Sequence, residues 1–137
     1  MKQININKSI SRKTHILSIL PCIFNSFQNT NYSFLCIAFN QDSEITSLTS
    51  FQNQNEYKLI GNIIDLCDVE STKSIVLIEK KFCINQDIAK STKLATNLGD
   101  ALDKMRTSLR DFIITDDNKE FFSLRYHDLL CGKFSEE

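Results

Sequence analysis

The 137-residue sequence contains only three glycines and one proline, so it has few of the residues that interrupt regular structure. It has no glycine-rich phosphate loop, which leaves nucleotide hydrolysis without a supporting motif. No apolar run approaches the roughly 20 residues that a transmembrane helix needs. The run HILSILPCIF follows basic residues, but Pro21 interrupts it and no small-residue cleavage site follows. We therefore expect a cytoplasmic protein that has no membrane segment.

Metal and disulfide patterns of cysteine are also lacking. The five cysteines form no CxxC pair, and their number is odd. Four of them lie in apolar runs, where a free thiol behaves as a small hydrophobic side chain. A reducing compartment is the simplest interpretation for Cys22, Cys36, Cys67, Cys83 and Cys131.

Acidic residues are missing from the first 41 positions, although the net charge of the chain is −1. The first acidic residue is Asp42, and four basic residues precede it, namely Lys2, Lys8, Arg12 and Lys13. This distribution predicts a mildly basic arm, which is typical of a solvated terminus and also compatible with phosphate contacts.

The composition that remains is that of a globular protein. Apolar residues make up 42% of the chain and charged residues 24%. A chain of this length is expected to form one domain, residues 1–137, with a core that needs no disulfide or metal.

The apolar pattern predicts a sequence of elements. Helical spacing favours a helix over 9–28, broken or restarted at Pro21. The polar segment 41–55 is predicted to be a loop, and Leu59, Ile63 and Leu66 make 57–66 compatible with either a strand or a helix. The runs YSFLCIAF and SIVLIEKKFC predict buried strands over 32–39 and 74–83.

The longest predicted element is a helix over 88–112, with Asn85 as its N-cap. Its apolar seam repeats in steps of three and four, and the segment after TDDNK predicts a strand that runs into a helical turn. The predicted fold is α+β: a helix, a three-stranded antiparallel meander, a long helix and a further strand, an αβββαβ-type core. The seam consists of Ala95, Leu98, Leu102, Met105, Leu109 and Phe112.

Strand periodicity predicts one cluster of charged groups. Glu79 and Lys81 share a face if 74–83 is a strand, because alternate side chains point the same way. If 57–66 is the preceding strand and the turn is centred near Thr72, Asp65 lies opposite Glu79 at a Cβ separation of about 5 Å. Two carboxylates at that distance repel each other unless a cation or a shared proton lies between them. A divalent metal would stabilise this pair, and Lys81 would act on a bound water.

An acid on one strand followed by E-x-K on the next resembles the PD-(D/E)xK nuclease superfamily, over roughly residues 61–130. Asp65 in GNIIDLC and Glu79 to Lys81 in SIVLIEKK match its signature. The later SLRYHDLL is similar to the closing segment of some relatives with restriction or defence roles. The resemblance implies a Mg²⁺- or Mn²⁺-dependent endonuclease in which Asp65 and Glu79 hold the metal and Lys81 completes the catalytic set.

The same resemblance implies contacts to DNA. The helix after the E-x-K strand often carries a polar residue near the site in this superfamily, and Gln86 is its nearest counterpart here. Lys80, Arg12 and Lys13 would contact the DNA backbone, which makes the expected binding sensitive to salt. A domain of this size forms only a shallow groove, so a homodimer is compatible with this function.

Two other interpretations stand beside the nuclease. Asp65, Glu79 and Lys81 are also explained as surface charges on an ordinary hairpin. The chain is also similar to small secretion chaperones of bacterial pathogens in its size, its slight acidity and its element order. In that case it is a non-enzymatic interaction module, and the seam of helix 88–112 binds a protein partner.

Overall fold

A computed structural model describes residues 21–23, 32–116 and 120–127. Seven elements follow residues 21–23, which are helical. They are β1 (Phe34–Phe39), β2 (Ile45–Phe51), α2 (Glu56–Glu70), β3 (Ser74–Lys81), α3 (Ile88–Asp103), β4 (Ser108–Asp116) and β5 (Glu120–Ser123). The α+β class is confirmed, as are the buried strands expected near 32–39 and 74–83.

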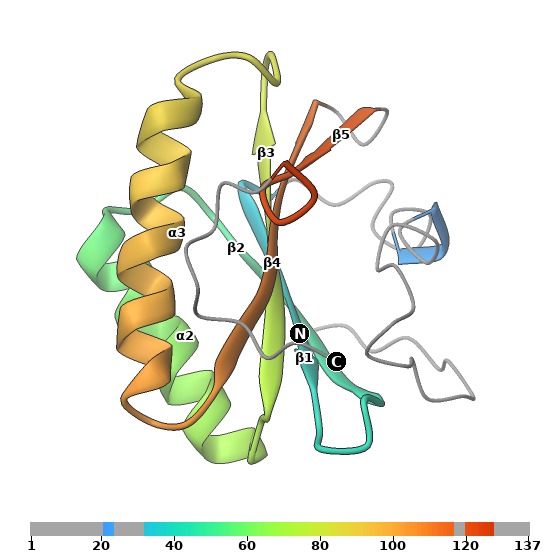
Figure 1. Ribbon diagram of the computed structural model, residues 1–137, viewed down its shortest axis with the longest axis vertical. Coiled ribbons are helices and arrows are strands. Elements are labelled where there is room, and N and C mark those ends of the chain that lie inside the picture. The colour runs from blue at the N-terminus through green and yellow to red at the C-terminus, as the bar shows by residue number, and fades with distance from the viewer. Residues whose placement is uncertain (1–20, 24–31, 117–119, 128–137) are drawn as a thin grey trace.

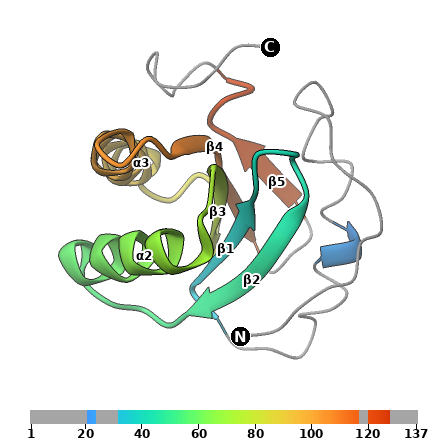
Figure 2. The same cartoon turned by 90° about the horizontal axis from the view of Figure 1, so that it is seen from below.

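The five strands form one mixed sheet in the order β2-β1-β3-β4-β5 (Figure 1). The pairs β2–β1, β1–β3 and β4–β5 are antiparallel, whereas β3 and β4 are parallel. The crossover between the parallel pair is α3, as such a connection requires. Seen along the strands, α2 and α3 lie on the same side of the sheet (Figure 2).

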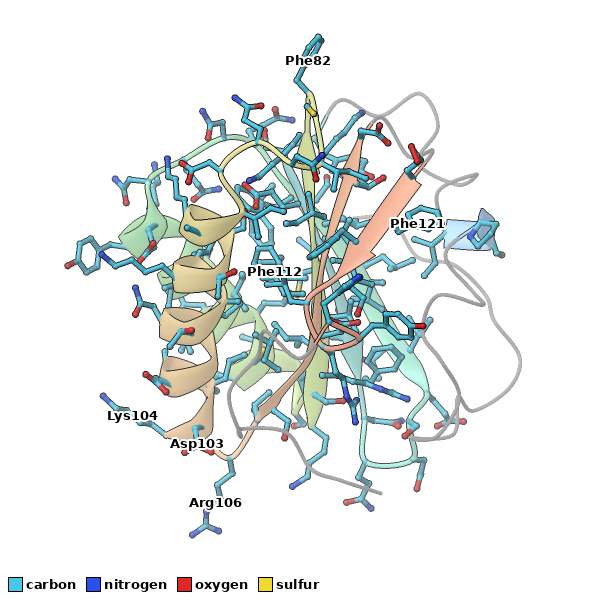
Figure 3. The ribbon with its side chains drawn as sticks, turned by 45° about the horizontal axis from the view of Figure 1, so that its top comes forward. Phe82, Asp103, Lys104, Arg106, Phe112 and Phe121 are labelled. Atoms are coloured by element: carbon cyan, nitrogen blue, oxygen red, sulfur yellow. The ribbon has the colours of Figure 1, made fainter. Side chains whose placement is uncertain are left out.

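The two faces of the sheet carry separate apolar clusters, because strand side chains alternate between faces. On the helix face, Cys36, Leu77 and Phe112 pack against the buried residues of α2 and α3; Phe112 lies between α3 and the sheet (Figure 3). On the opposite face, Ile37 and Val76 belong to a cluster that also includes Ile23, Tyr32, Leu35, Phe39, Leu48, Ile78 and Ile113.

Segment 57–66 is part of a helix, so the strand expected there in the meander is wrong. The apolar positions Leu59, Ile63 and Cys67 repeat every four residues and are buried in the helix-face cluster. Asn55 caps this helix by accepting a hydrogen bond from the Lys58 N–H, and Ser71 ends it in the left-handed conformation (φ 52°).

The third antiparallel strand is instead β2, within a segment expected to be a loop. Its sequence ITSLTSF has little apolar content, but every residue from Ser47 to Phe51 pairs with β1. The serine- and threonine-rich sequence therefore did not predict a strand here, although backbone pairing with β1 stabilises one.

The predicted helix 88–112 is wrong in its second half. α3 ends at Asp103, and Arg106 (φ 62°) lies in the reversal that leads to β4. Leu109 and Phe112 continue the helical spacing by coincidence but belong to a strand. The N-cap is Asp87, whose carboxylate accepts a hydrogen bond from the Lys90 N–H, and not Asn85.

The remaining expectations concern the ends of the chain and membranes. The strand followed by a helical turn after TDDNK is confirmed as β5 and the turns that follow it. The predicted helix 9–28 falls mainly outside the described residues. Within the described ranges, no helix combines the length and the apolar composition needed to cross a bilayer.

Candidate functional site

The carboxyl ends of the parallel strands β3 and β4 bring charged residues to one edge of the sheet. Glu79 and Lys81 follow the buried Ile75 and Leu77 on the helix face of β3. Lys81 pairs with Asp116 of β4, and residues paired across a sheet point to the same face. Loops and side chains at the carboxyl ends of parallel strands are a common place for binding sites.

Glu79 is hydrogen-bonded to α3. Its Oε1 accepts a 2.6 Å hydrogen bond from the hydroxyl of Ser91, a residue that is buried in the first turn of the helix. Because the acceptor is ionised, this hydrogen bond is stronger than one between neutral groups. The carboxylate therefore ties the end of β3 to the start of α3.

Lys81 holds the connection between the same two elements. Its Nζ donates hydrogen bonds to the backbone carbonyls of Gln86 and Asp87, the second at 3.0 Å. The Gln86 N–H in turn donates to the Cys83 carbonyl at 3.0 Å and closes a turn within the connection. We call residues 82–87 the β3–α3 loop; Lys81 therefore links the end of β3 to the last two residues of this loop.

An aromatic side chain stands at the tip of the β3–α3 loop. Phe82 is 97% exposed and projects away from the end of β3 (Figure 3). Cys83 beside it is exposed, whereas Ile84 packs against the helix-face cluster. The loop is thus anchored at both ends while it presents a phenyl ring to solvent.

Asp65 does not join this cluster. It lies on α2 two residues after the buried Ile63, which is about 200° around the helix, and it is exposed on the side away from the sheet. The strand that does pair antiparallel with β3 is β1, where Phe34 lies opposite Glu79. The predicted juxtaposition of Asp65 and Glu79 is therefore wrong, because it required segment 57–66 to be a strand.

The predicted DNA-contact residues are also dispersed. Lys80 alternates with Lys81 and points to the opposite face of β3, where its Nζ lies 4.9 Å from the ring centre of Tyr32. Gln86 is exposed in the β3–α3 loop, next to Lys81 through its backbone carbonyl. Arg12 and Lys13 lie outside the described residues.

A buried carboxylate was missed by sequence reasoning. Asp111 of β4 is only 2% exposed, and its Oδ2 accepts a 2.6 Å hydrogen bond from the Ser123 hydroxyl. Its Oδ1 accepts from the N–H groups of Phe112 and Arg125 at 2.7 and 3.1 Å. Burial raises the pKa of Asp111, and these hydrogen bonds and the charge of Arg125 partly offset the increase. The only signal in the sequence is a charged pair inside an apolar run, RDFII.

Asp111 has a structural explanation. A register shift opposite Ile75 and Val76 lets β4 accommodate an extra residue beside Asp111. The carboxylate then binds both β5 and the turn that follows it, where His127 Nδ1 lies 2.9 Å from the Ser123 carbonyl. This network fastens the end of the described chain to the sheet.

Comparison with protein-family models and with curated proteins finds no match to this sequence. Within the ranges that the structure describes, no group of three or more His, Cys, Asp or Glu residues is arranged to hold a metal ion. The site is therefore defined by its own geometry: Glu79 and Lys81 hold the β3–α3 loop, and Asp116 lies opposite Lys81.

Proposed function

We propose that this protein is an interaction module that binds a protein partner through the β3–α3 loop. The observation that carries the proposal is a fully exposed phenylalanine on a loop whose ends are held by side-chain hydrogen bonds. A large apolar side chain on a loop whose backbone is already held loses less conformational entropy on binding than the same side chain on an unanchored loop. Aromatic anchors of this kind supply much of the binding energy of protein interfaces.

The partner surface proposed here differs from the one expected from the sequence. Leu94, Leu98 and Leu102 of α3 are buried against the sheet, so that seam belongs to the core. Phe82 and the neighbouring Cys83 are exposed apolar groups at the carboxyl end of β3, whereas the hairpin β1–β2 lies beside its amino end. The ligand class that fits a protruding phenyl ring is a folded protein with a complementary apolar pocket.

The test is a binding measurement with a matched exposed aromatic as control. A protein partner is first isolated as one that co-purifies with the natural sequence in stoichiometric amount. Its affinity for the natural sequence, for Phe82→Ser and for Tyr57→Ser is then measured by titration calorimetry. Tyr57 is 90% exposed on α2, so its removal changes apolar surface without touching the loop. We expect Phe82→Ser to weaken binding at least 30-fold and Tyr57→Ser to change it less than threefold. Equal losses in the two variants would refute the role of the loop.

A contribution of loop order is tested separately. Lys81→Met removes the donor to Gln86 and Asp87 but leaves Phe82 in place. We expect faster hydrogen exchange within 82–87 and weaker partner binding, while Lys93→Met on the exposed side of α3 changes neither. Unchanged exchange in Lys81→Met would show that other contacts order the loop.

We propose metal-dependent cleavage of DNA as the second candidate function, because Lys81 is paired with Asp116 and Glu79 lies two residues earlier on the same face of β3. Each carboxylate has one oxygen engaged, Glu79 Oε1 by Ser91 and Asp116 Oδ1 by the Glu120 N–H at 2.9 Å. Glu79 and Asp116 would hold Mg²⁺, which prefers a few carboxylates and keeps several waters. In this arrangement Asp116 takes the place that the sequence pattern assigned to Asp65.

This candidate is tested with plasmid DNA and Mg²⁺ or Mn²⁺. Loss of cleavage in Glu79→Gln and Asp116→Asn, with Asp65→Asn unaffected, is the expected pattern if the edge is a nuclease site. Calorimetric titration of the protein with Mg²⁺ alone measures metal binding even if no DNA is cleaved. Absence of both cleavage and metal binding would remove this candidate and leave the interaction module untouched.

A further inference from the structure

The two edges of the sheet differ in how they are protected against pairing with another strand. β5 has only four residues, begins with the charged Glu120 and leads directly into a turn. β2 has seven residues, ITSLTSF, and no charged side chain or proline among them. Short length, charge and proline are usual means by which proteins block an edge strand, and β2 has none of these three; its one irregularity is the register shift at its start.

The backbone of β2 has polar groups directed outward. The Phe51 carbonyl accepts a hydrogen bond from the Ser33 N–H on the β1 side. Because N–H and C=O groups alternate in direction along a strand, Ser47 and Thr49 also face β1, and Leu48 and Ser50 face outward. The register shift opposite Ala38 and Phe39 lies at the start of β2 and leaves 47–51 regular. Among the described residues, no strand pairs with this outer side of β2.

The order of side chains in β2 is symmetric about Leu48. An apolar residue stands at both ends and in the centre, and two hydroxyl residues separate each apolar pair. When β2 pairs antiparallel with itself around Leu48, each residue meets one of its own class: Ser47 meets Thr49, and Thr46, which lies at the register shift, meets Ser50. Cross-strand pairs of threonine and serine stabilise a sheet, and no like charges meet in this register.

The flank of α2 that faces the segment after β2 carries an exposed apolar group. Asn62 of α2 donates a 2.8 Å hydrogen bond to Gln54, three residues after β2, so this flank of the helix lies on the β2 side. Val69 is seven residues later on the same flank and is 77% exposed.

We infer that β2 is a homodimer interface, in which two copies of this chain join their β2 edges antiparallel with Leu48 on the two-fold axis. The two five-stranded sheets then form one continuous sheet, and the outward N–H and C=O groups of Leu48 and Ser50 gain partners. A self-complementary strand favours a second copy over an extended peptide of unrelated sequence. The inference does not depend on the function of the β3–α3 loop.

The association is tested by sedimentation equilibrium of the whole chain between micromolar and millimolar concentration. We expect a monomer–dimer equilibrium in the natural sequence and a dissociation constant at least tenfold higher in Ser50→Lys, which introduces charge at the edge. Ser50→Pro removes only an outward N–H and should have the same effect, because the pairing of Ser47 and Thr49 with β1 is kept. Ser50→Ala is the matched control and should dimerise as the natural sequence does. Circular dichroism confirms that each variant is folded.

Hydrogen exchange measured residue by residue identifies the edge that is used. In the dimer, the Leu48 and Ser50 amides should become protected as concentration rises, whereas the Ser47 and Thr49 amides are protected at every concentration. A monomer throughout this range would overturn the inference. So would a dimer whose formation is unchanged in Ser50→Lys and Ser50→Pro, or one that protects the β5 edge instead.

Discussion

The hydroxyl of Ser91 in α3 lies 2.6 Å from the Glu79 carboxylate in β3 and donates a hydrogen bond to it. The first turn of the crossover helix is thereby joined to the end of the strand that precedes it. This contact also sets the position from which Lys81, two residues later, reaches the β3–α3 loop.

Ser91→Ala is expected to lower the free energy of unfolding by about 1–2 kcal/mol, since a hydrogen bond to a charged group is lost. The better helix propensity of alanine offsets about 0.5 kcal/mol of that loss. Urea denaturation measures the effect. Thr96→Ala is the control, because the Thr96 hydroxyl is exposed and bonds only to the Thr92 carbonyl of its own helix. Equal stability of both variants would contradict a structural role for the Glu79 contact.

Leu98→Ala should lower the free energy of unfolding by about 2–5 kcal/mol, because Leu98 is fully buried between α3 and the sheet. A residue on a partner-binding surface would instead change binding with little effect on stability. Lys93→Ala, exposed on the same helix, is expected to change stability by less than about 0.5 kcal/mol. Thermal and urea unfolding of both variants give the comparison, and a loss under 1 kcal/mol in Leu98→Ala would place this seam outside the core.

The carboxyl of Asp111 should make stability depend on pH. Burial raises its pKa in the folded state above the ordinary aspartate value, so the folded state binds this proton more tightly than the unfolded state. Its contribution to the free energy of unfolding is therefore largest below the ordinary aspartate pKa and decreases as pH rises through the folded pKa. Asp111→Asn cannot titrate, and it retains an oxygen that can accept from Phe112 and Arg125.

Urea denaturation of the natural sequence and Asp111→Asn from pH 3.5 to 7 isolates this group, because the other carboxyls cancel in the difference. We expect the stability of Asp111→Asn relative to the natural sequence to increase as pH rises. A difference independent of pH would show that the folded pKa of Asp111 is not raised. Asp111→Ala, which leaves Ser123 and two N–H groups without their acceptor, should cost about 2–4 kcal/mol, with the same direction of pH dependence as Asp111→Asn.

The cysteines should differ in their reaction with a thiol reagent. Burial raises the pKa of Cys67 to about 11 and raises the pKa of Cys36 as well, so little thiolate exists at either position near neutral pH. Cys83 is exposed in the β3–α3 loop. We expect Cys83 to be labelled at least 100-fold faster than Cys36 or Cys67 in the folded protein, with the difference lost in urea. Peptide mass spectrometry follows each site, and rapid labelling of Cys67 without denaturant would contradict its burial.

The local sequence was sufficient to predict those elements whose conformation depends mainly on their own residues. The runs over 34–39 and 75–78 are apolar at every position, and each is buried on both faces of the sheet. The parity of β3 correctly placed Glu79 and Lys81 on one face, since that relation depends only on the strand itself. Likewise, the spacing of Leu59 and Ile63 contained the helix α2 as one of its two interpretations.

Long-range packing specified the rest. β2 is a strand because β1 offers it backbone partners, and its sequence lacks the apolar alternation that identifies a strand. Leu109 and Phe112 continue the spacing of α3, yet they enter the sheet because β3 has a free edge that β4 fills in parallel. The neighbours of Glu79 are Ser91 and Phe34, not Asp65, since the order of strands in a sheet is set by which hydrogen-bonding edges and apolar faces meet. The spacing of residues along the chain does not determine which strands become neighbours.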